Sequence, residues 1–306
     1  VLERKAVNAI LGSAQVVCAT LSMLDGSILS REAFDVALFD EATQAIEPLS
    51  LGAFTKAETV ILAGDPMQLS PTVISLDAQK QGLGRSLFER LLGDHGESVK
   101  RMLKEQHRMH ETIMRFPSEA TYGGQLRAHP DAAHRDLAPL LTAPLDAPPV
   151  LFLDTAGKGF DETKAPQTES LRNEGEADLI VARVNALTAA GVRPEDLAVI
   201  TPYRAQAQLL RERLAGLAGL EVDTVDAFQG REKEAVVLSL VRSNTEQQLG
   251  FLEDLRRLNV ALTRPRRHLF VVGDSATLSA HPLYARWTEF VTNAEGYRSA
   301  WEWVEP

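Results

Sequence analysis

Short apolar runs alternate with amphipathic segments along most of the 306-residue chain. In the first half, Phe34–Phe39 and residues 59–63 have the length and composition of buried parallel strands, with a helix expected from Ala45. A first helix is expected to end at Gly12, and residues 15–20 predict a further short buried strand. Strand, helix and strand in this order indicate a doubly wound α/β sheet.

A proline-rich stretch separates this half from a second alternation of the same kind. Residues 83–122 are predicted to be mainly helical, and the five prolines within residues 128–149 make that stretch a candidate linker. The second half has predicted strands at 150–154, 197–201, 222–225, 235–240 and 268–273, and predicted helices at 174–190, 206–217, 253–264 and 284–291. The pattern predicts two tandem α/β domains with parallel sheets, residues 1–145 and 146–306.

Composition narrows the class of protein. A hydrophobic content of 44% suffices for a core, and no run approaches the roughly 20 apolar residues of a membrane span. No signal peptide opens the sequence, so we expect no membrane association. The single cysteine, Cys18, lies in an apolar run and is expected to be a buried, inert thiol, which fits a cytoplasmic protein.

The charge balance bears on the partner. A formal net charge of −10 argues against a protein that coats nucleic acid by charge alone, but a local basic groove remains compatible with it. One short stretch is rich in arginine: Arg256, Arg257, Arg264, Arg266 and Arg267.

Candidate catalytic residues follow the predicted strands. Asp40 and Glu41 end the first of these strands, where one carboxylate can hold Mg²⁺ and the next can orient or deprotonate water. A lone pair of adjacent acids is about equally compatible with a solvated loop. Gln68 could bond that water and a terminal phosphate, and Arg108 and Arg264 could neutralise charge on the phosphoryl oxygens. Together these residues point to transfer or hydrolysis of a terminal phosphate.

Six motifs occur in a specific order along nearly the whole chain. They are Asp40-Glu41-Ala42-Thr43-Gln44, Gly64-Asp65-Pro66-Met67-Gln68-Leu69, Gln106-His107-Arg108-Met109-His110, Thr201-Pro202-Tyr203, Thr224-Val225-Asp226-Ala227-Phe228-Gln229-Gly230-Arg231-Glu232 and Asn259-Val260-Ala261-Leu262-Thr263-Arg264. In this set and order the chain resembles superfamily 1 nucleic-acid helicases of the up-frameshift and immunoglobulin-mu-binding type. Any one motif alone would be weak, whereas the set is specific.

The resemblance implies two RecA-like lobes, the first incomplete, with ATP and Mg²⁺ between them and a single nucleic-acid strand across their top. By position, Asp40 matches the magnesium ligand, Glu41 the catalytic base and Gln68 the γ-phosphate sensor. The two arginines that reach the phosphates from opposite lobes match Arg108 and Arg264, and contacts to the γ-phosphate and ribose match Gly230 and Glu232. Contacts to the strand's backbone match Thr20, Pro71, Thr72, Thr201 and Thr224.

The chain departs from the family pattern in three places. His107 stands where a tyrosine usually stacks on adenine, which puts base preference in question more than activity. Pro265 follows Arg264 where a small residue is common, and it would end the preceding helix early. No Gly-x-x-x-x-Gly-Lys-Ser/Thr loop occurs, because the only Gly-Lys pair, Gly157-Lys158, is followed by glycine.

We therefore expect the carboxyl-terminal motor portion of a longer helicase, monomeric and translocating 5′→3′, which needs an upstream segment to hydrolyse ATP at a useful rate. The alternative is a non-catalytic module, derived from a helicase, that binds nucleic acid or a partner. A nuclease-linked repair factor is a weaker third reading, because the sequence has no nuclease-type acid cluster. The motifs do not distinguish DNA from RNA.

Overall fold

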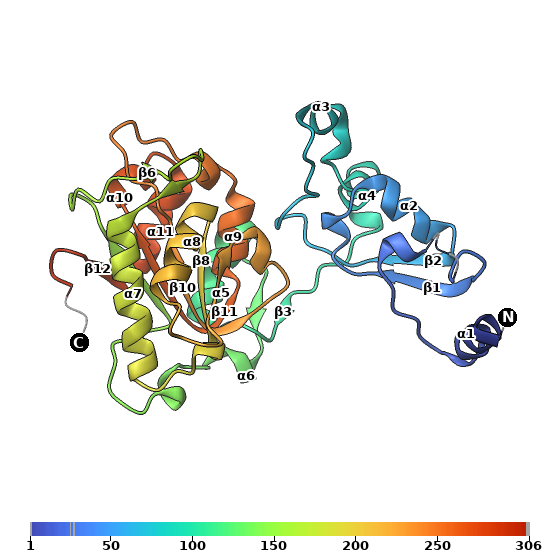
Figure 1. Cartoon of the computed structure of the whole chain (residues 1–306), viewed down its shortest axis with the longest axis horizontal. Helices are drawn as coiled ribbons and strands as arrows, with labels where there is room; N and C mark the ends of the chain where they lie inside the picture. The colour runs from blue at the N-terminus through green and yellow to red at the C-terminus, as the bar shows by residue number, and fades with distance from the viewer. Residues whose placement is uncertain (1, 25, 27, 304–306) are drawn as a thin grey trace. The chain divides into compact units, whose positions relative to one another are not determined.

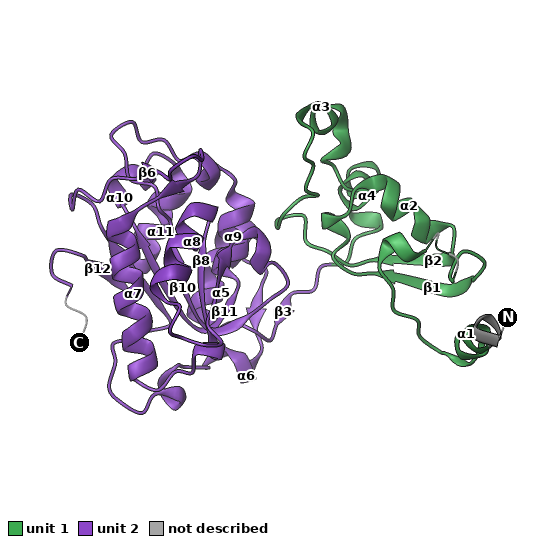
Figure 2. Cartoon of the chain, in the orientation of Figure 1, with its two compact units in different colours: residues 1–101 green, residues 102–306 purple. Residues whose placement is uncertain are grey.

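The computed structural model describes residues 2–24, 26 and 28–303 (Figure 1). The chain divides into two compact units, Val1–Arg101 (unit 1) and Met102–Pro306 (unit 2), which Figure 2 colours separately. The proline-rich stretch 128–149 lies inside unit 2. The domain boundary predicted between residues 145 and 146 would separate two ATPase lobes, and it stays a prediction.

Unit 1 is built around a two-stranded parallel sheet. Strands β1 (Phe34–Phe39) and β2 (Ala57–Leu62) pair from Phe34↔Ala57 to Phe39↔Leu62. The other elements of unit 1 are α1 (Leu2–Ser13), η1 (Leu21–Met23), η2 (Ala42–Gln44), α2 (Glu47–Phe54), α3 (Leu76–Ala78), η3 (Gln79–Leu83), α4 (Leu87–His95) and η4 (Gly96–Ser98). A capping box between Ser86 and Glu89 starts α4.

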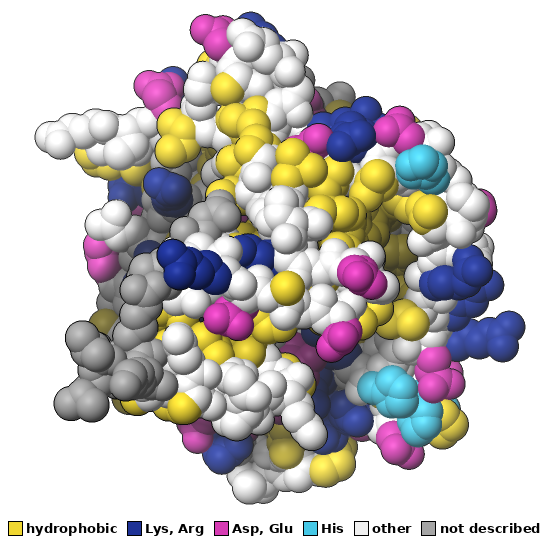
Figure 3. All heavy atoms as spheres, turned by 90° about the vertical axis from the view of Figure 1, so that its right-hand side faces the viewer, with side chains coloured by type: hydrophobic (Ala, Val, Ile, Leu, Met, Phe, Trp, Pro, Cys, Tyr) yellow, Lys and Arg dark blue, Asp and Glu magenta, His cyan; other side chains and the backbone are white. Residues whose placement is uncertain are grey.

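Both strands form where the sequence predicts them, but the prediction that they are buried is wrong in this structure. Val36 is 51%, Leu38 68% and Ile61 48% exposed. These side chains share one face of the sheet, because Leu38 pairs with Ile61 and alternate residues point the same way. A parallel strand is buried only when layers cover both of its faces, and this sheet has one face open. Apolar side chains are accordingly visible at the surface in the space-filling view of Figure 3.

The predicted strand at residues 15–20 does not form. The structure pairs these residues with no strand among the residues that it describes, and an extended segment needs such a partner to satisfy its backbone. Cys18 is exposed there, so the expected buried thiol is a wrong prediction.

Unit 2 contains a six-stranded, fully parallel sheet in the order β12-β5-β11-β10-β8-β9. Its strands are β5 (Val150–Asp154), β8 (Leu197–Thr201), β9 (Glu221–Thr224), β10 (Lys233–Ser239), β11 (Pro265–Gly273) and β12 (Tyr297–Ser299). Its α-helices are α5 (Glu111–Thr121), α6 (Pro130–Ala133), α7 (Glu174–Ala189), α8 (Arg204–Arg213), α9 (Leu255–Leu262), α10 (Ser275–Leu278) and α11 (Pro282–Asn293). Short elements complete it: β3 (Glu105–Gln106), β4 (Arg127–Ala128), η5 (Ala138–Leu140), β6 (Thr163–Lys164), β7 (Leu171–Arg172), η6 (Pro194–Asp196), η7 (Asp226–Phe228) and η8 (Gly250–Glu253).

Helices cover both faces of this sheet. Helices α7 and α8 pack on one face, where Ile180 and Leu210 join Val237 and Phe270 in one buried cluster. Helices α5 and α11 contact β11 and β5 outside that cluster, and their Phe116 and Trp287 rings meet edge to face. The five residues of β5 and the five of β8 are all buried. Burial on both faces explains why these strands are continuous apolar runs.

The predicted α/β class with parallel sheets is confirmed. The predicted helical stretch 83–122 is only partly helical, because residues 99–110 lie outside any helix. Leu137, in the proline-rich stretch, is buried in the unit 2 core. None of the helices in the described part of the chain has the length and apolar character needed to cross a membrane.

Candidate functional site

In unit 1, Asp40 and Glu41 lie directly after β1, at the carboxyl edge of the sheet. Asp40 is exposed, and its Oδ1 accepts a hydrogen bond from the Glu41 backbone N–H at 3.0 Å. Glu41 has a φ of 52°, a left-handed conformation that is uncommon for residues other than glycine, and its Oε2 accepts from Gln44 Nε2 at 2.7 Å. Strained backbone of this kind is concentrated at functional sites.

The loop after β2 runs beside this acid pair. A Cβ on Gly64 would lie 3.1 Å from the backbone nitrogen of Thr43, so a side chain there would be in tight contact with the segment that follows the acid pair. Gln68 donates from Nε2 to Asp65 Oδ2 at 2.9 Å, and Asp65 Oδ1 accepts from the Met67 N–H at 2.9 Å. Asp65 thereby holds the amide of Gln68 at the same sheet edge as the two carboxylates.

The acid pair suits Mg²⁺ better than a metal with a full protein cage. The described residues contain no group of three or more His, Cys, Asp or Glu that could hold a metal ion. Mg²⁺ is usually held by one or two carboxylates together with waters and substrate phosphates. The exposed Asp40 carboxylate, which has no ion pair among the described residues, fits that requirement. Mg²⁺ bound there would neutralise charge on phosphate oxygens.

In unit 2, Gln106 shapes the turn that carries His107 and Arg108. Its Oε1 accepts from the N–H groups of Arg108 (2.9 Å) and Met109 (2.7 Å), and its Nε2 donates to the Met109 carbonyl at 2.9 Å. His110 then caps α5, because its Nδ1 accepts from the Thr112 N–H at 3.0 Å. Burial lowers the pKa of His110, which keeps the imidazole neutral for this cap. The two histidines therefore lie on a turn and a helix cap, and the predicted helix over this motif is wrong.

Arg108 belongs to a charged cluster with residues far away in sequence. Its Nε donates to Glu232, and its Nη1 donates to the Thr263 carbonyl at 3.0 Å. Glu232 also faces Arg266 Nε at 3.1 Å. Glu232 directly precedes β10, and Arg264 directly precedes β11, so the cluster lies at the amino-terminal edge of the central strands.

Arg264 is 1% exposed and is wrapped by its own unit. Its Nε donates to the Val260 carbonyl (2.8 Å), its Nη1 to the Arg231 carbonyl (3.2 Å) and its Nη2 to Thr263 Oγ1 (2.9 Å). Thr263 therefore connects the two guanidinium groups, through its carbonyl to Arg108 and through its hydroxyl to Arg264.

Pro265 lies after the helix rather than inside it. Helix α9 ends at Leu262, and Pro265 is the first residue of β11, where it pairs with Lys233. The arginines after it are held by Glu234, which accepts from Arg266 Nη1 at 2.6 Å and from Arg267 Nε at 2.5 Å. Burial alone would raise the pKa of Glu234, but the bonds from these two arginines outweigh it and lower the pKa.

The His107 ring is stacked on another imidazole. The ring centroids of His107 and His129 are 4.3 Å apart, with an angle of 25° between the planes. One face of His107 is thus covered, so a base could stack only on the opposite face. Gly230, in the same predicted nucleotide-binding set, is exposed and has a φ of 77°, which favours glycine.

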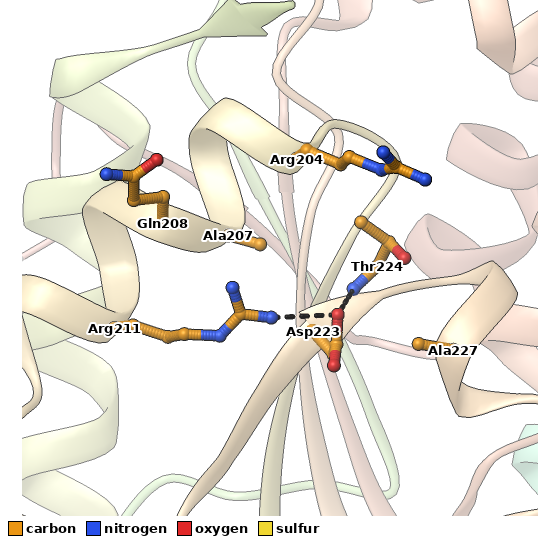
Figure 4. Close-up of a pocket in the computed structure, with 7 residues that line it drawn as sticks. All are labelled: Arg204, Ala207, Gln208, Arg211, Asp223, Thr224 and Ala227. Atoms are coloured by element: carbon orange, nitrogen blue, oxygen red, sulfur yellow. Dashed lines mark hydrogen bonds and ion pairs between the residues drawn. The ribbon is translucent and has the colours of Figure 1, made fainter.

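Thr201 and Thr224 end β8 and β9, at the opposite, carboxyl edge of the sheet, and they pair with each other in register. Thr201 is fully buried, and its hydroxyl has no hydrogen-bond partner among the residues that the structure describes. Thr224 is half-buried and lines a pocket of about 440 Å³ between α8 and β9 (Figure 4). Its walls are formed by Arg204, Ala207, Gln208, Arg211, Asp223, Thr224 and Ala227.

Next to these residues, the chain leaves β10 through a strained turn. Val241 has a φ of 71°, and the Arg242 N–H donates across it to the Leu240 carbonyl at 2.8 Å, which makes a γ-turn. Two buried side chains hold the turn: Glu176 Oε2 accepts the Val241 N–H at 2.9 Å, and Asn173 Nδ2 donates to the Val241 carbonyl at 3.1 Å.

Residues 83–276, more than half of the chain, match a protein family described as an AAA domain, and residues 2–76 match a second family with the same description. This chain belongs to the AAA-domain family. DNA-binding protein SMUBP-2 of Rattus norvegicus is 43% identical to this chain over 311 residues, which cover 99% of this chain and 32% of that relative. DNA polymerase alpha-associated DNA helicase A of Schizosaccharomyces pombe is 40% identical, over 94% of the chain and 44% of the relative.

A third relative is regulator of nonsense transcripts 1 of Dictyostelium discoideum. It is 39% identical to this chain, over 92% of this chain and 22% of the relative's own length. The chain spans about a third of the length of the curated SMUBP-2 relatives that it matches. These relatives confirm the resemblance to superfamily 1 helicases of the up-frameshift and immunoglobulin-mu-binding type.

The structure separates the predicted site residues into three groups. Asp40, Glu41 and Gln68 lie at one sheet edge of unit 1. The predicted strand contacts Thr20, Pro71 and Thr72 also belong to unit 1, where Thr20 and Thr72 are exposed and Pro71 is buried. The predicted nucleotide set of unit 2 lies in three segments: His107 and Arg108 on the turn between β3 and α5, Gly230 and Glu232 just before β10, and Arg264 just before β11. Thr201 and Thr224 form the third group. Arg108 and Arg264 both belong to unit 2, and that they reach the phosphates from opposite lobes stays a prediction.

The sequence did not indicate several residues that hold the predicted site residues in place. His129 stacks on His107, Glu234 binds two arginines, and Tyr122 accepts a hydrogen bond from Asn259 Nδ2 at 2.7 Å. Each acts across a long sequence separation and belongs to no motif. Arg204 had a visible signal, because it directly follows the Thr201-Pro202-Tyr203 motif.

Proposed function

We propose that the chain forms part of the motor of an ATP-dependent helicase or translocase that moves along single-stranded nucleic acid, in the 5′→3′ direction of the family it resembles. The observation that carries the proposal is the meeting of Arg108, Glu232 and Thr263-Arg264 in one charged cluster of unit 2. These residues come from three separate motifs, and a purely structural role would not require all three motifs to retain their charged residues. The family match supports the same conclusion.

In this proposal, ATP with Mg²⁺ is the substrate. Asp40 would hold the ion, Glu41 would deprotonate or orient the attacking water, and Gln68 would sense the terminal phosphate. Arg108 and Arg264 would neutralise charge on the phosphates, Gly230 and Glu232 would meet the γ-phosphate and ribose, and the open face of His107 would stack on the base. Arg264 must leave the carbonyls of Val260 and Arg231 to act in this way.

We propose further that this chain alone does not hydrolyse ATP at a useful rate, because its 306 residues contain no Gly-x-x-x-x-Gly-Lys-Ser/Thr loop. A monomeric motor in a reducing, cytoplasmic compartment is proposed, since the sequence has one cysteine and so no internal disulfide. Phosphate contacts from Thr20, Pro71, Thr72, Thr201 and Thr224 would grip DNA or RNA without reading its sequence.

The test is ATP turnover, with and without oligo(dT) or oligo(rU), by this chain and by a longer chain that carries a phosphate-binding loop. We expect turnover stimulated by single strands only from the longer chain. Equally strong turnover by the 306 residues would contradict the proposed dependence on the loop, and no turnover by either would contradict the motor.

A second candidate function is a non-catalytic clamp that binds nucleic acid. The enclosed guanidinium of Arg264, at 1% exposure, favours it, since a clamp has no need for a free arginine finger. The same turnover experiment separates the two: a clamp binds oligonucleotides without nucleotide hydrolysis in the longer chain.

A further inference from the structure

The pocket between α8 and β9 contains a cation that local structure does not explain (Figure 4). Arg204 is the first residue of α8, where the aligned peptide dipoles repel positive charge. The first turn of α8 holds no acidic residue, and the side chain of Tyr203 does not cap the helix. Arg204 is exposed, and the structure records no ion pair for it in the described part of the chain. The preference against a cation at a helix amino terminus is therefore violated, and no recorded ion pair compensates for it, which is the pattern expected at binding sites.

The second arginine of the pocket behaves differently. Arg211 Nη2 lies 2.8 Å from Asp223 Oδ1, and its Nε donates to the Val222 carbonyl at 2.8 Å. Asp223 Oδ1 also accepts the Thr224 N–H at 2.8 Å. The charge of Asp223 is thus already matched within the pocket, and Arg204 remains in excess.

The excess cation lies next to a hydroxyl group that can donate to an anion. Figure 4 shows the Arg204 guanidinium on the Thr224 side of the pocket, away from the Arg211–Asp223 pair. Thr224 uses its N–H for Asp223, and the structure records no partner for its hydroxyl among the described residues. A guanidinium and a hydroxyl at the mouth of a pocket of about 440 Å³ form the chemistry that recognises a phosphate group.

We propose that Arg204, together with the Thr224 hydroxyl, binds one backbone phosphate of a single-stranded nucleic acid. The inference rests on the proposed function, in which Thr224 contacts the strand, and it assigns the contact's charge to a residue outside every motif. Because β9 is the edge strand of the sheet, this phosphate site lies at its outer, carboxyl corner. The phosphate chemistry is shared by DNA and RNA, so both should bind.

The expected effect follows from counterion release. Each phosphate neutralised on a single strand contributes about 0.7 to the slope of log affinity against log salt concentration. At about 0.1 M salt one such contact is worth about fivefold in affinity relative to 1 M. Arg204→Gln should therefore weaken binding about fivefold and flatten the slope by about 0.7, equally for oligo(dT) and oligo(rU).

The experiment measures fluorescence anisotropy of labelled oligo(dT) and oligo(rU), about 20 nucleotides long, against the whole chain between about 50 and 200 mM KCl. Arg204→Lys should keep the slope, and Thr224→Val should lower affinity while leaving the slope near that of the wild type. The charge-matched control is Arg286→Gln on α11, an exposed arginine without a recorded ion pair, whose helix packs against β5 and β12 at the other end of the sheet. It should bind like the wild type.

Folding is checked on the same samples by thermal denaturation. Removing a cation from a helix amino terminus should not lower the melting temperature, so a loss of binding by Arg204→Gln would not reflect unfolding. An Arg204→Gln variant with the wild-type affinity and slope would overturn the phosphate site while leaving the proposed function intact. An equal loss in Arg286→Gln would also overturn it, by showing an effect of net charge alone. A wild-type chain that binds neither oligonucleotide would overturn the proposed strand contact and this site with it.

Discussion

The buried carboxyl group of Glu176 gives the sharpest test of how unit 2 is held together. Glu176 lies in the first turn of α7 with no exposed surface, and its Oε2 accepts from Ser239 Oγ at 2.6 Å and from the Val241 N–H at 2.9 Å. Its Oε1 is buried and has no hydrogen-bond partner within the described part of the chain. Burial raises the pKa of Glu176 from 4.5 to about 8, against the lowering effect of those two bonds.

This pKa makes stability depend on pH in a defined direction. The folded state favours the protonated carboxyl, so its contribution is fully present below about pH 4.5 and is lost as pH rises through about 8. At about 1.4 kcal/mol for each pKa unit, the difference between the two pKa values sets an upper bound of about 5 kcal/mol. Glu176→Gln replaces the protonated acid by a neutral isostere. We expect it to match the wild type within about 1 kcal/mol near pH 5 and to be more stable by several kcal/mol above about pH 8.

Urea unfolding followed by tryptophan fluorescence measures this effect, because Trp287, Trp301 and Trp303 all belong to unit 2. The informative quantity is the difference in unfolding free energy between variant and wild type as a function of pH, since other titrating groups cancel in it. Glu289→Gln, an exposed glutamate on α11 without a recorded partner, is the control and should give a flat difference. A flat difference for Glu176→Gln as well would refute the argument from burial.

Three further outcomes are expected. In a chain that carries a phosphate-binding loop, Glu41→Gln should abolish ATP turnover and keep nucleotide binding. Glu58 is an exposed glutamate on β2, and Glu58→Gln should leave both turnover and binding unchanged. Hydrolysis retained by Glu41→Gln would exclude Glu41 as the catalytic base. Arg264→Ala should lower turnover in that chain by about 10³- to 10⁵-fold, and a rate within a few-fold of the parent excludes the arginine-finger role. Gly250→Ala should destabilise unit 2 by about 1–3 kcal/mol in urea unfolding, because residue 250 has a φ of 56° and a Cβ would lie 2.3 Å from Arg242 Nη1; an unchanged midpoint would show that the loop relaxes freely.

Two strands of unit 2, β5 and β8, were predictable because their burial is complete. Residues 150–154 and 197–201 form β5 and β8 with the predicted bounds, since both faces are covered and every residue is apolar or ends the strand. In unit 1 the same type of run gave the right strand and the wrong burial. Strand formation depends on local composition, but burial depends on whether another layer of the fold covers each face.

The motif around Arg108 has a local structure that the periodicity of apolar residues does not predict. Its residues were expected in a helix, yet the Gln106 amide makes three hydrogen bonds to the backbone of the turn and so replaces helical hydrogen bonds. Side-chain capping of this kind leaves no repeating apolar pattern in the sequence. The candidate residues could therefore be identified from their motif, while the unit they belong to and the partners that orient them required coordinates.

Strand β10 joins the two edges of the unit 2 sheet that carry the proposed contact residues. Strand β10 begins directly after Glu232 and ends close to the Val241 turn. It pairs with β11 up to Ser239, and its residues Ala235 to Leu238 also pair with β8. A strand bonded on both sides and buried from residue 235 onward cannot absorb a change at one end by bending. Movement linked to nucleotide should therefore occur in the flanking glycine-bearing loops, at Gly230 and Gly250, which have left-handed backbones. Amide hydrogen exchange as fast in residues 235–239 as in these loops would contradict that assignment.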